Sequence, residues 1–196
     1  MRKIGVFTVG LVLTLAYAAQ NATWGDFQGR VVTEWLDDGR RMRLLEDFQY
    51  IDPRGEKWLA LKGAVIDGAS IPRPFWSYIG GPFEGKYRNA SVIHDVACQE
   101  KTRSWRNVHQ MFYVAVLRGG VDEVTAKVMY GAVYFWGPRW KVDLARTLND
   151  DADFLRMREY IRRNSSISLE GIEKLTREFL KEAIPEVPPP VRIPAA

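Results

Sequence analysis

The sequence contains a single cysteine, Cys98, and only two histidines among its 196 residues. One cysteine excludes a disulfide-stapled scaffold, and it also excludes zinc or iron–sulfur sites that need several thiolates. Apolar residues make up 46% of the chain and charged residues 27%, which excludes a wholly disordered protein. The length suits one domain of ordinary size with extensions, and no internal repeat is visible.

Long hydrophobic runs are also scarce, and the one that stands out lies at the N-terminus. Arg2 and Lys3 precede an apolar run over residues 4–16, and Ala16-Tyr17-Ala18 has the small-x-small pattern of a cleavage site. The run is short for a bilayer span, so a membrane anchor is the weaker interpretation. We therefore expect residues 1–18 to be a signal peptide and the protein to be exported, to the periplasm or beyond the cell.

The chain also lacks a large excess of basic or of acidic residues. The formal net charge is +4, and removal of residues 1–18 leaves only two more basic than acidic residues. A surface that binds nucleic acid needs a larger basic excess than this. We expect no nucleic-acid partner.

Residues 24–140 predict an α+β core domain. Three β-like runs, each bounded by Asp-, Pro- and Gly-rich turns, predict a small antiparallel meander over residues 30–36, 41–51 and 56–62. Helical patterns follow, over residues 90–100, 107–118 and from an N-cap at Asp122 to residue 136. Residues 63–85, between the two halves, are too rich in glycine and proline to predict either element.

The C-terminal part differs in character from the core domain. Residues 141–184 carry nine basic and nine acidic residues around sparse apolar positions, which predicts a charged appendage of two amphipathic helices. Residues 185–196 hold five of the ten prolines and predict an extended tail. These segments are either solvated or an arm, residues 141–196, that binds an envelope polymer, a lipid or a protein.

The candidate site lies where the meander gives way to the helices. Asp67 stands at the end of a β-like run beside Gly68, and His94 and Asp95 lie on the first predicted helix. A carboxylate near an imidazole can orient a general base or hold a cation. His109 lies on the next helix, which an antiparallel pairing would bring close to His94. We predict His94, Asp95 and Asp67 as catalytic residues, and Asp67, Asp95 and His109 as ligands of a divalent metal.

Each of these residues also has a structural interpretation. His94 could be a buried group that hydrogen-bonds Asp67 and pins the loop, and Asp67 could cap the turn at residues 68–70. Ser70 is either a nucleophile or a turn residue. Cys98 lies four residues after His94 on the same helix face, so it is either part of a thiolate–imidazolium pair or a small buried residue.

Several motifs in order resemble one uncharacterised bacterial and phage family, domain of unknown function 1353. They are Asp67-Gly-Ala-Ser-Ile-Pro72, Phe75-Trp76, Gly85-x-Tyr87, His94-Asp95 and Gly119-Gly-Val121. The similarity covers roughly residues 44–140 and brings no established activity. The family pattern has an Ala-Asp pair where this chain has Val108-His109, so the resemblance implies a shift from hard cations toward zinc.

A weaker similarity links Tyr78-x-Gly80-Gly81 and His94-Asp95 to the calcium loop and His-Asp dyad of secreted phospholipases A2. In those enzymes the imidazole takes a proton from water while the carboxylate and loop carbonyls hold Ca²⁺. The cysteines that frame the dyad there are replaced here by Ala90 and Ser91. This resemblance implies calcium as the metal.

Two functions remain open from the sequence. The first is an exported, metal-assisted hydrolase that attacks an ester or amide of an envelope polymer or lipid through Asp67, His94, Asp95 and His109. The second is a non-enzymatic, envelope- or phage-associated binding or structural protein, in which the His-Asp cluster is a structural staple.

Overall fold

A computed structural model describes residues 24–68, 81, 83–141 and 151–180 of the chain. Over these residues, two small antiparallel sheets precede five α-helices, which confirms the predicted α+β class. The proposed signal peptide, Ser70 and the proline-rich tail lie outside the described residues. None of the described helices combines the length and the apolar character needed to cross a membrane.

The six strands divide between the two sheets. One sheet has the order β1-β4-β5, with strands β1 (Asp26–Gln28), β4 (Phe48–Ile51) and β5 (Lys57–Ala60). The other has the order β2-β3-β6, with strands β2 (Thr33–Trp35), β3 (Met42–Leu44) and β6 (Val65–Ile66). The run predicted over residues 41–51 therefore contains two strands that belong to different sheets. Strand β1 was not predicted, because three residues are too few to show an alternating pattern, whereas β6 is the β-like run that was expected to end at Asp67.

Each sheet has one buried face. In β5 the side chains of Trp58 and Ala60 are buried while those of Lys57 and Leu59 are exposed, as the two-residue period of a strand requires. The turn from β4 to β5 is held by Asp52, whose carboxylate accepts hydrogen bonds from backbone amides and from the Trp58 indole. The buried faces pack toward the helices.

Three helices follow a short 3-10 turn at Gly85–Tyr87. They are α3 (Arg88–Glu100), α4 (Trp105–Arg118) and α5 (Glu123–Trp136). Ser104 caps α4 by accepting a hydrogen bond from the Asn107 amide at 3.2 Å, and Asp122 caps α5 through the Thr125 amide at 2.9 Å. The predicted N-cap at Asp122 is thereby confirmed.

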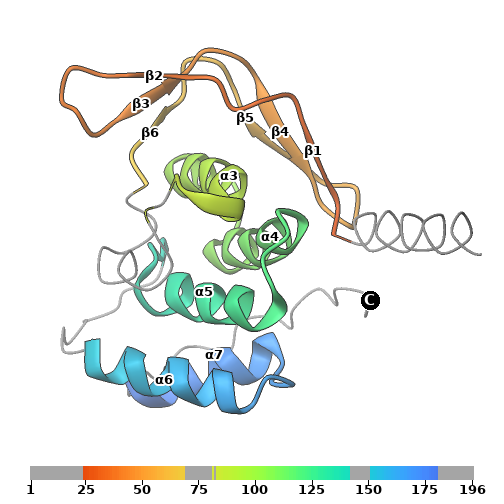
Figure 1. Cartoon of the computed structure of the whole chain (residues 1–196), viewed down its shortest axis with the longest axis vertical. Helices are drawn as coiled ribbons and strands as arrows, with labels where there is room; N and C mark the ends of the chain where they lie inside the picture. Colours follow the sequence, from red (N-terminus) through yellow and green to blue (C-terminus); the bar gives the residue numbers. More distant parts are fainter. Residues whose placement is uncertain (1–23, 69–80, 82, 142–150, 181–196) are drawn as a thin grey trace, which may run out of the picture.

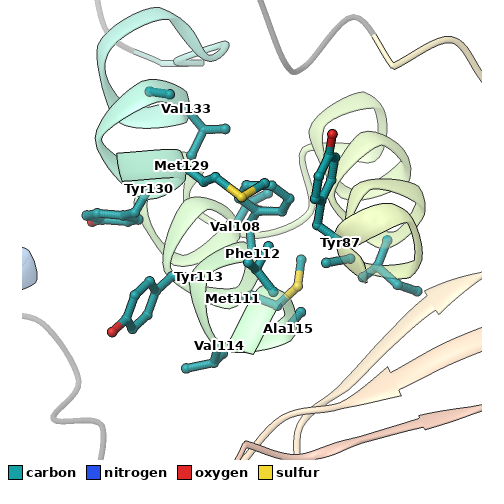
Figure 2. Packing of buried hydrophobic residues seen from close by; sticks show 14 of the residues in the cluster. Tyr87, Val108, Met111, Phe112, Tyr113, Val114, Ala115, Met129, Tyr130 and Val133 are labelled. Atoms are coloured by element: carbon teal, nitrogen blue, oxygen red, sulfur yellow. The ribbon is translucent and has the colours of Figure 1, made fainter. Parts of the chain in front are cut away.

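The elements stack in layers (Figure 1). The sheets cover α3, α4 lies between α3 and α5, and α6 (Asp151–Arg163) and α7 (Leu169–Leu180) pack against the far side of α5. Figure 2 shows Val108, Phe112 and Met129 gathered where α4 meets α5. Helix α4 is the centre of this stack, and nearly all of its residues are buried.

The two C-terminal helices are part of the same hydrophobic core. Phe154, Met157 and Ile161 of α6 and Ile172 of α7 are all buried. A Cβ on Gly131 of α5 would lie 3.1 Å from the Met157 methyl carbon, so glycine lets α6 approach closely. The amphipathic pattern predicted for residues 141–184 is thus used to cover α5.

Candidate metal centre

The two histidines of the chain meet at the interface of α3 and α4. His94 comes from the middle of α3 and His109 from the second turn of α4, and both side chains are fully buried. The Nε2 atom of His94 lies 2.9 Å from the Nδ1 atom of His109. At this distance one ring donates a hydrogen bond to the other when both are neutral, and the tautomers decide which ring is the donor. The structure therefore brings together the two imidazoles that the sequence placed on neighbouring helices.

Cys98 completes the group from one turn further along α3. Its Sγ atom lies 3.7 Å from Nε2 of His94 and 3.9 Å from Nδ1, and the thiol is buried. One ring nitrogen from each histidine and the Cys98 sulfur all lie within 4.8 Å of one another. Cys98 was not predicted as a metal ligand, although its four-residue spacing from His94 is visible in the sequence.

The spacing of these donors can be compared with that of a zinc site. Zinc bonds of about 2.1 Å to nitrogen and 2.3 Å to sulfur place tetrahedral nitrogen–nitrogen pairs about 3.4 Å apart and nitrogen–sulfur pairs about 3.6 Å apart. The corresponding separations here are 2.9 Å and 3.7 Å. These two separations lie within about 0.5 Å of the tetrahedral values, and all three donors lie within 4.8 Å of one another, so the group could hold a metal ion.

Burial favours the neutral form of His94. Desolvation lowers the pKa of His94 from 6.5 to about 3, because the interior disfavours the charged imidazolium. The ring of Phe112 lies 4.6 Å from that of His94, centroid to centroid, and adds apolar surroundings. A neutral imidazole is the form that binds a metal, so protons do not compete for His94 near pH 7.

The end of α5 closes the group on the side of His109. A Cβ on Gly137 would lie 2.8 Å from Cε1 and 2.9 Å from Nε2 of His109. The Trp105 ring lies 5.7 Å from the same imidazole, centroid to centroid. The absence of a side chain at Gly137 is therefore what lets the end of α5 rest against this ring.

The two predicted carboxylates have other contacts. The Oδ2 atom of Asp95, which is 2% exposed, accepts hydrogen bonds from the amides of Asp67 at 2.9 Å and Gly68 at 3.2 Å. The Asp67 carboxylate forms an ion pair with Arg40 at 3.3 Å. The loop is thus held by Asp95, not by a bond from His94 to Asp67. The catalytic and metal-binding roles of Asp67 and Asp95 remain predictions.

Comparisons with known proteins agree with the motif analysis. Residues 42–133 match the family described as protein of unknown function (DUF1353). Two uncharacterised proteins of Sinorhizobium fredii (strain NBRC 101917 / NGR234) are similar. The protein y4jT is 42% identical over 147 residues, or 72% of this chain, and y4iH is 40% identical over 103 residues, or 53%.

The chain matches less than half of the length of each of these two relatives. This chain covers 44% of the length of y4jT and 43% of y4iH. No solved structure matches the chain. The comparisons give no support to the similarity to secreted phospholipases A2. Over residues 42–133, the chain is similar to the DUF1353 family of proteins of unknown function, as its motifs predicted.

Proposed function

We propose that this chain is an exported protein that holds a zinc-class divalent cation between α3 and α4, through His94, Cys98 and His109. The observation that supports this proposal is the placement of three donor atoms, all within 4.8 Å of one another, in the buried interface of two helices. Buried polar groups carry a desolvation cost, which metal coordination offsets.

The donor types favour zinc over calcium. Imidazole and thiolate suit zinc and similar transition metals, whereas calcium takes six to eight oxygen ligands. Asp95, the carboxylate adjacent to His94 in sequence, uses its Oδ2 atom to hold the amides of Asp67 and Gly68. The calcium alternative therefore has less support than the zinc alternative.

Beyond metal binding, we propose a hydrolytic activity, which the number of protein ligands supports. Three protein ligands leave one coordination position for water, and a zinc-bound water is an effective nucleophile near neutral pH. The substrate in this proposal is an ester or amide of an envelope polymer or lipid. Asp95 would act as a positioning residue, since it holds the backbone at Asp67 and Gly68.

The burial of both imidazoles favours the second candidate function. A buried metal that water does not reach suits a structural role, because a catalytic zinc keeps one position for water or substrate. In this alternative the metal links α3 to α4 and stabilises the fold of a non-enzymatic, envelope- or phage-associated protein. The exposed, charged sides of α6 and α7 would then be the surface for a protein, lipid or polymer partner.

The test of the metal centre is cobalt binding by the purified full chain. We expect one equivalent of Co²⁺ per chain, displaced by Zn²⁺, with a thiolate-to-cobalt charge-transfer band in the near ultraviolet. Cys98→Ala should abolish that band, and His109→Ala should lower the cobalt affinity at least tenfold. Zinc should also raise the melting temperature of the wild type.

Phe112→Leu is the matched control, because it disturbs the packing around His94 without removing a donor atom. It should keep both the band and the stoichiometry. Wild-type protein that binds no cobalt, or a Cys98→Ala variant with an unchanged band, would overturn the proposal.

The activity and the location need separate measurements. Zinc-loaded wild type should hydrolyse a chromogenic ester faster than Cys98→Ala. Equal rates would overturn the hydrolytic proposal and favour a structural role for the metal. Export predicts that the protein recovered from the periplasm or medium has lost residues 1–18, as read by its intact mass. Full-length chain confined to the cytoplasm would contradict export.

A further inference from the structure

A second buried polar group lies where side chains of α4, α5 and α7 meet. The Glu173 carboxylate of α7 is 1% exposed, and the side chain of its ion-pair partner Arg106 is 9% exposed. The Nε atom of Arg106 lies 2.9 Å from Oε1 and its Nη2 atom lies 2.6 Å from Oε2. This is a bidentate pairing, the strongest geometry between a guanidinium and a carboxylate.

Two further donors face the same carboxylate. The Tyr130 hydroxyl donates to Oε1 of Glu173 at 2.6 Å, and Nε2 of Gln110 lies 3.5 Å from the same atom. Tyr130 is fully buried, and burial raises its pKa well above the usual value, so it remains a donor at any ordinary pH. One carboxylate therefore meets donors from three side chains.

The donors and the acceptor come from different parts of the chain. Arg106 and Gln110 lie one turn apart on α4, and Tyr130 lies on α5, all within the family-matched residues 42–133. Glu173 lies on α7, forty residues beyond the end of that match. Helices α4 and α5 pack directly on each other through apolar residues, and this packing brings the three donors of the two helices together.

We propose that Arg106, Gln110 and Tyr130 form a carboxylate-binding socket in the family-matched domain, and that this chain fills the socket with its own Glu173. The ligand class is a carboxylate, from an acidic side chain or a small organic acid. A desolvated guanidinium without an anion is strongly unfavourable, so the socket selects the position of α7 that supplies one. The other glutamates of α7, Glu170 and Glu178, are exposed and do not occupy it.

The test is chemical complementation of a Glu173→Ala variant of the full chain. In sodium chloride we expect its melting temperature to fall on the order of 10 °C below that of the wild type, because a buried charge loses its partner. Formate or acetate at the same ionic strength should enter the space left by the side chain and recover several degrees. Neutral acetamide at the same concentration should recover none.

Two controls separate binding in the socket from a general effect of the anion. Glu178→Ala removes an exposed glutamate from the same helix and should show no shift specific to acetate. The double variant Arg106→Leu with Glu173→Ala should lose the acetate response, because the guanidinium that binds the anion is gone.

The same melting temperature for Glu173→Ala in acetate and in chloride would overturn the proposal. If the alanine variant does not fold in chloride, its refolding yield from urea replaces the melting temperature. A higher yield in acetate than in chloride supports the socket, and equal yields overturn it. The measurement is made with EDTA present, so its outcome is independent of the metal centre.

Discussion

The carboxylate of Asp95 accepts a hydrogen bond from the backbone nitrogen of Asp67 at 2.9 Å. Asp95 directly follows His94, whose ring contacts His109 on α4. Successive side chains of a helix point about 100° apart, so one helix can serve two neighbours with adjacent residues. Helix α3 thereby connects the end of β6 on one side and α4 on the other.

The Asp95 contact predicts a stability effect that is separate from metal binding. Asp95→Ala should lower the free energy of unfolding by roughly 2 to 4 kcal/mol, because two backbone amides lose their acceptor. Asp95→Asn keeps an acceptor oxygen and should cost less. Urea denaturation followed by tryptophan fluorescence measures both.

Asp67→Asn is the control for this comparison. Its ion pair with Arg40 is partly exposed, so the loss should stay below about 1 kcal/mol. Equal losses for Asp67→Asn and Asp95→Ala would contradict the assignment of Asp95 as the residue that holds the loop. A loss of cobalt binding in Asp95→Asn would instead indicate a ligand role for that carboxylate.

Gly137 predicts a coupling between the end of α5 and the metal centre. Gly137→Ala would place a methyl group 2.8 Å from the His109 ring and 2.1 Å from the Val133 carbonyl oxygen, so the ring or the helix end must move. We expect a loss of about 2 kcal/mol or more in stability and a weaker affinity for cobalt. Cobalt titration and thermal melting measure the two effects.

Gly131→Ala is the matched control on the same helix. Its new methyl group would meet the flexible ends of Met157 and Ile161, and alanine is the better helix former by about 1 kcal/mol. Its cobalt affinity should equal that of the wild type. If both glycine variants bind cobalt as the wild type does, the end of α5 does not position His109.

The buried His94 predicts a pH dependence of stability in metal-free protein. Its pKa is about 3 in the folded state, below the ordinary value of 6.5, so the unfolded chain binds the proton more readily. The stabilisation is complete above pH 6.5 and is lost as the pH falls toward 3. Between pH 6.5 and pH 5 the loss should be roughly 1.5 to 2 kcal/mol.

His94→Gln isolates this contribution. Urea denaturation in EDTA at a series of pH values should give a shallower acid loss for His94→Gln than for the wild type. Phe112→Leu keeps the histidine and should keep the wild-type slope. Parallel pH profiles for all three proteins would show that His94 is already charged or is exposed to solvent in the folded state.

The packing of α6 on α5 predicts that the C-terminal helices unfold together with the rest of the protein. Ile161→Ala should cost roughly 2 to 5 kcal/mol, because Ile161 is fully buried in the shared core. Leu155 is on the same helix but partly exposed, so Leu155→Ala should cost less. Circular dichroism and tryptophan fluorescence should report one common transition, and two separated transitions would contradict this prediction.

Local sequence patterns predicted most of the elements. The N-cap at Asp122, the end of that helix at residue 136 and the helical pattern over residues 107–118 are signals within one or two helical turns. The turn at Asp52 also marked the hairpin between β4 and β5. The division of residues 41–51 between two sheets was missed, because strand pairing depends on partners distant in sequence.

The candidate site was recovered only in part, for a similar reason. The sequence identified His94 and His109 and placed them on neighbouring helices, and the structure places their rings in contact. It also named Asp67 and Asp95, and the structure places the first beside Arg40 and the second beside two backbone amides, while their catalytic and metal-binding roles remain predictions. Which donor atom faces which group depends on how the helices are rotated about their axes.

The sequence by itself determined the helices, their caps and the amphipathic faces of residues 151–180, because those features depend on neighbours a few residues away. Only the tertiary structure decided that His109 meets His94 and Cys98 at one point and that Glu173 meets Arg106, a residue 67 positions earlier. Such pairings arise when apolar faces pack and fix the rotation of each helix. No local pattern specifies that rotation, so these contacts could be read only from the folded chain.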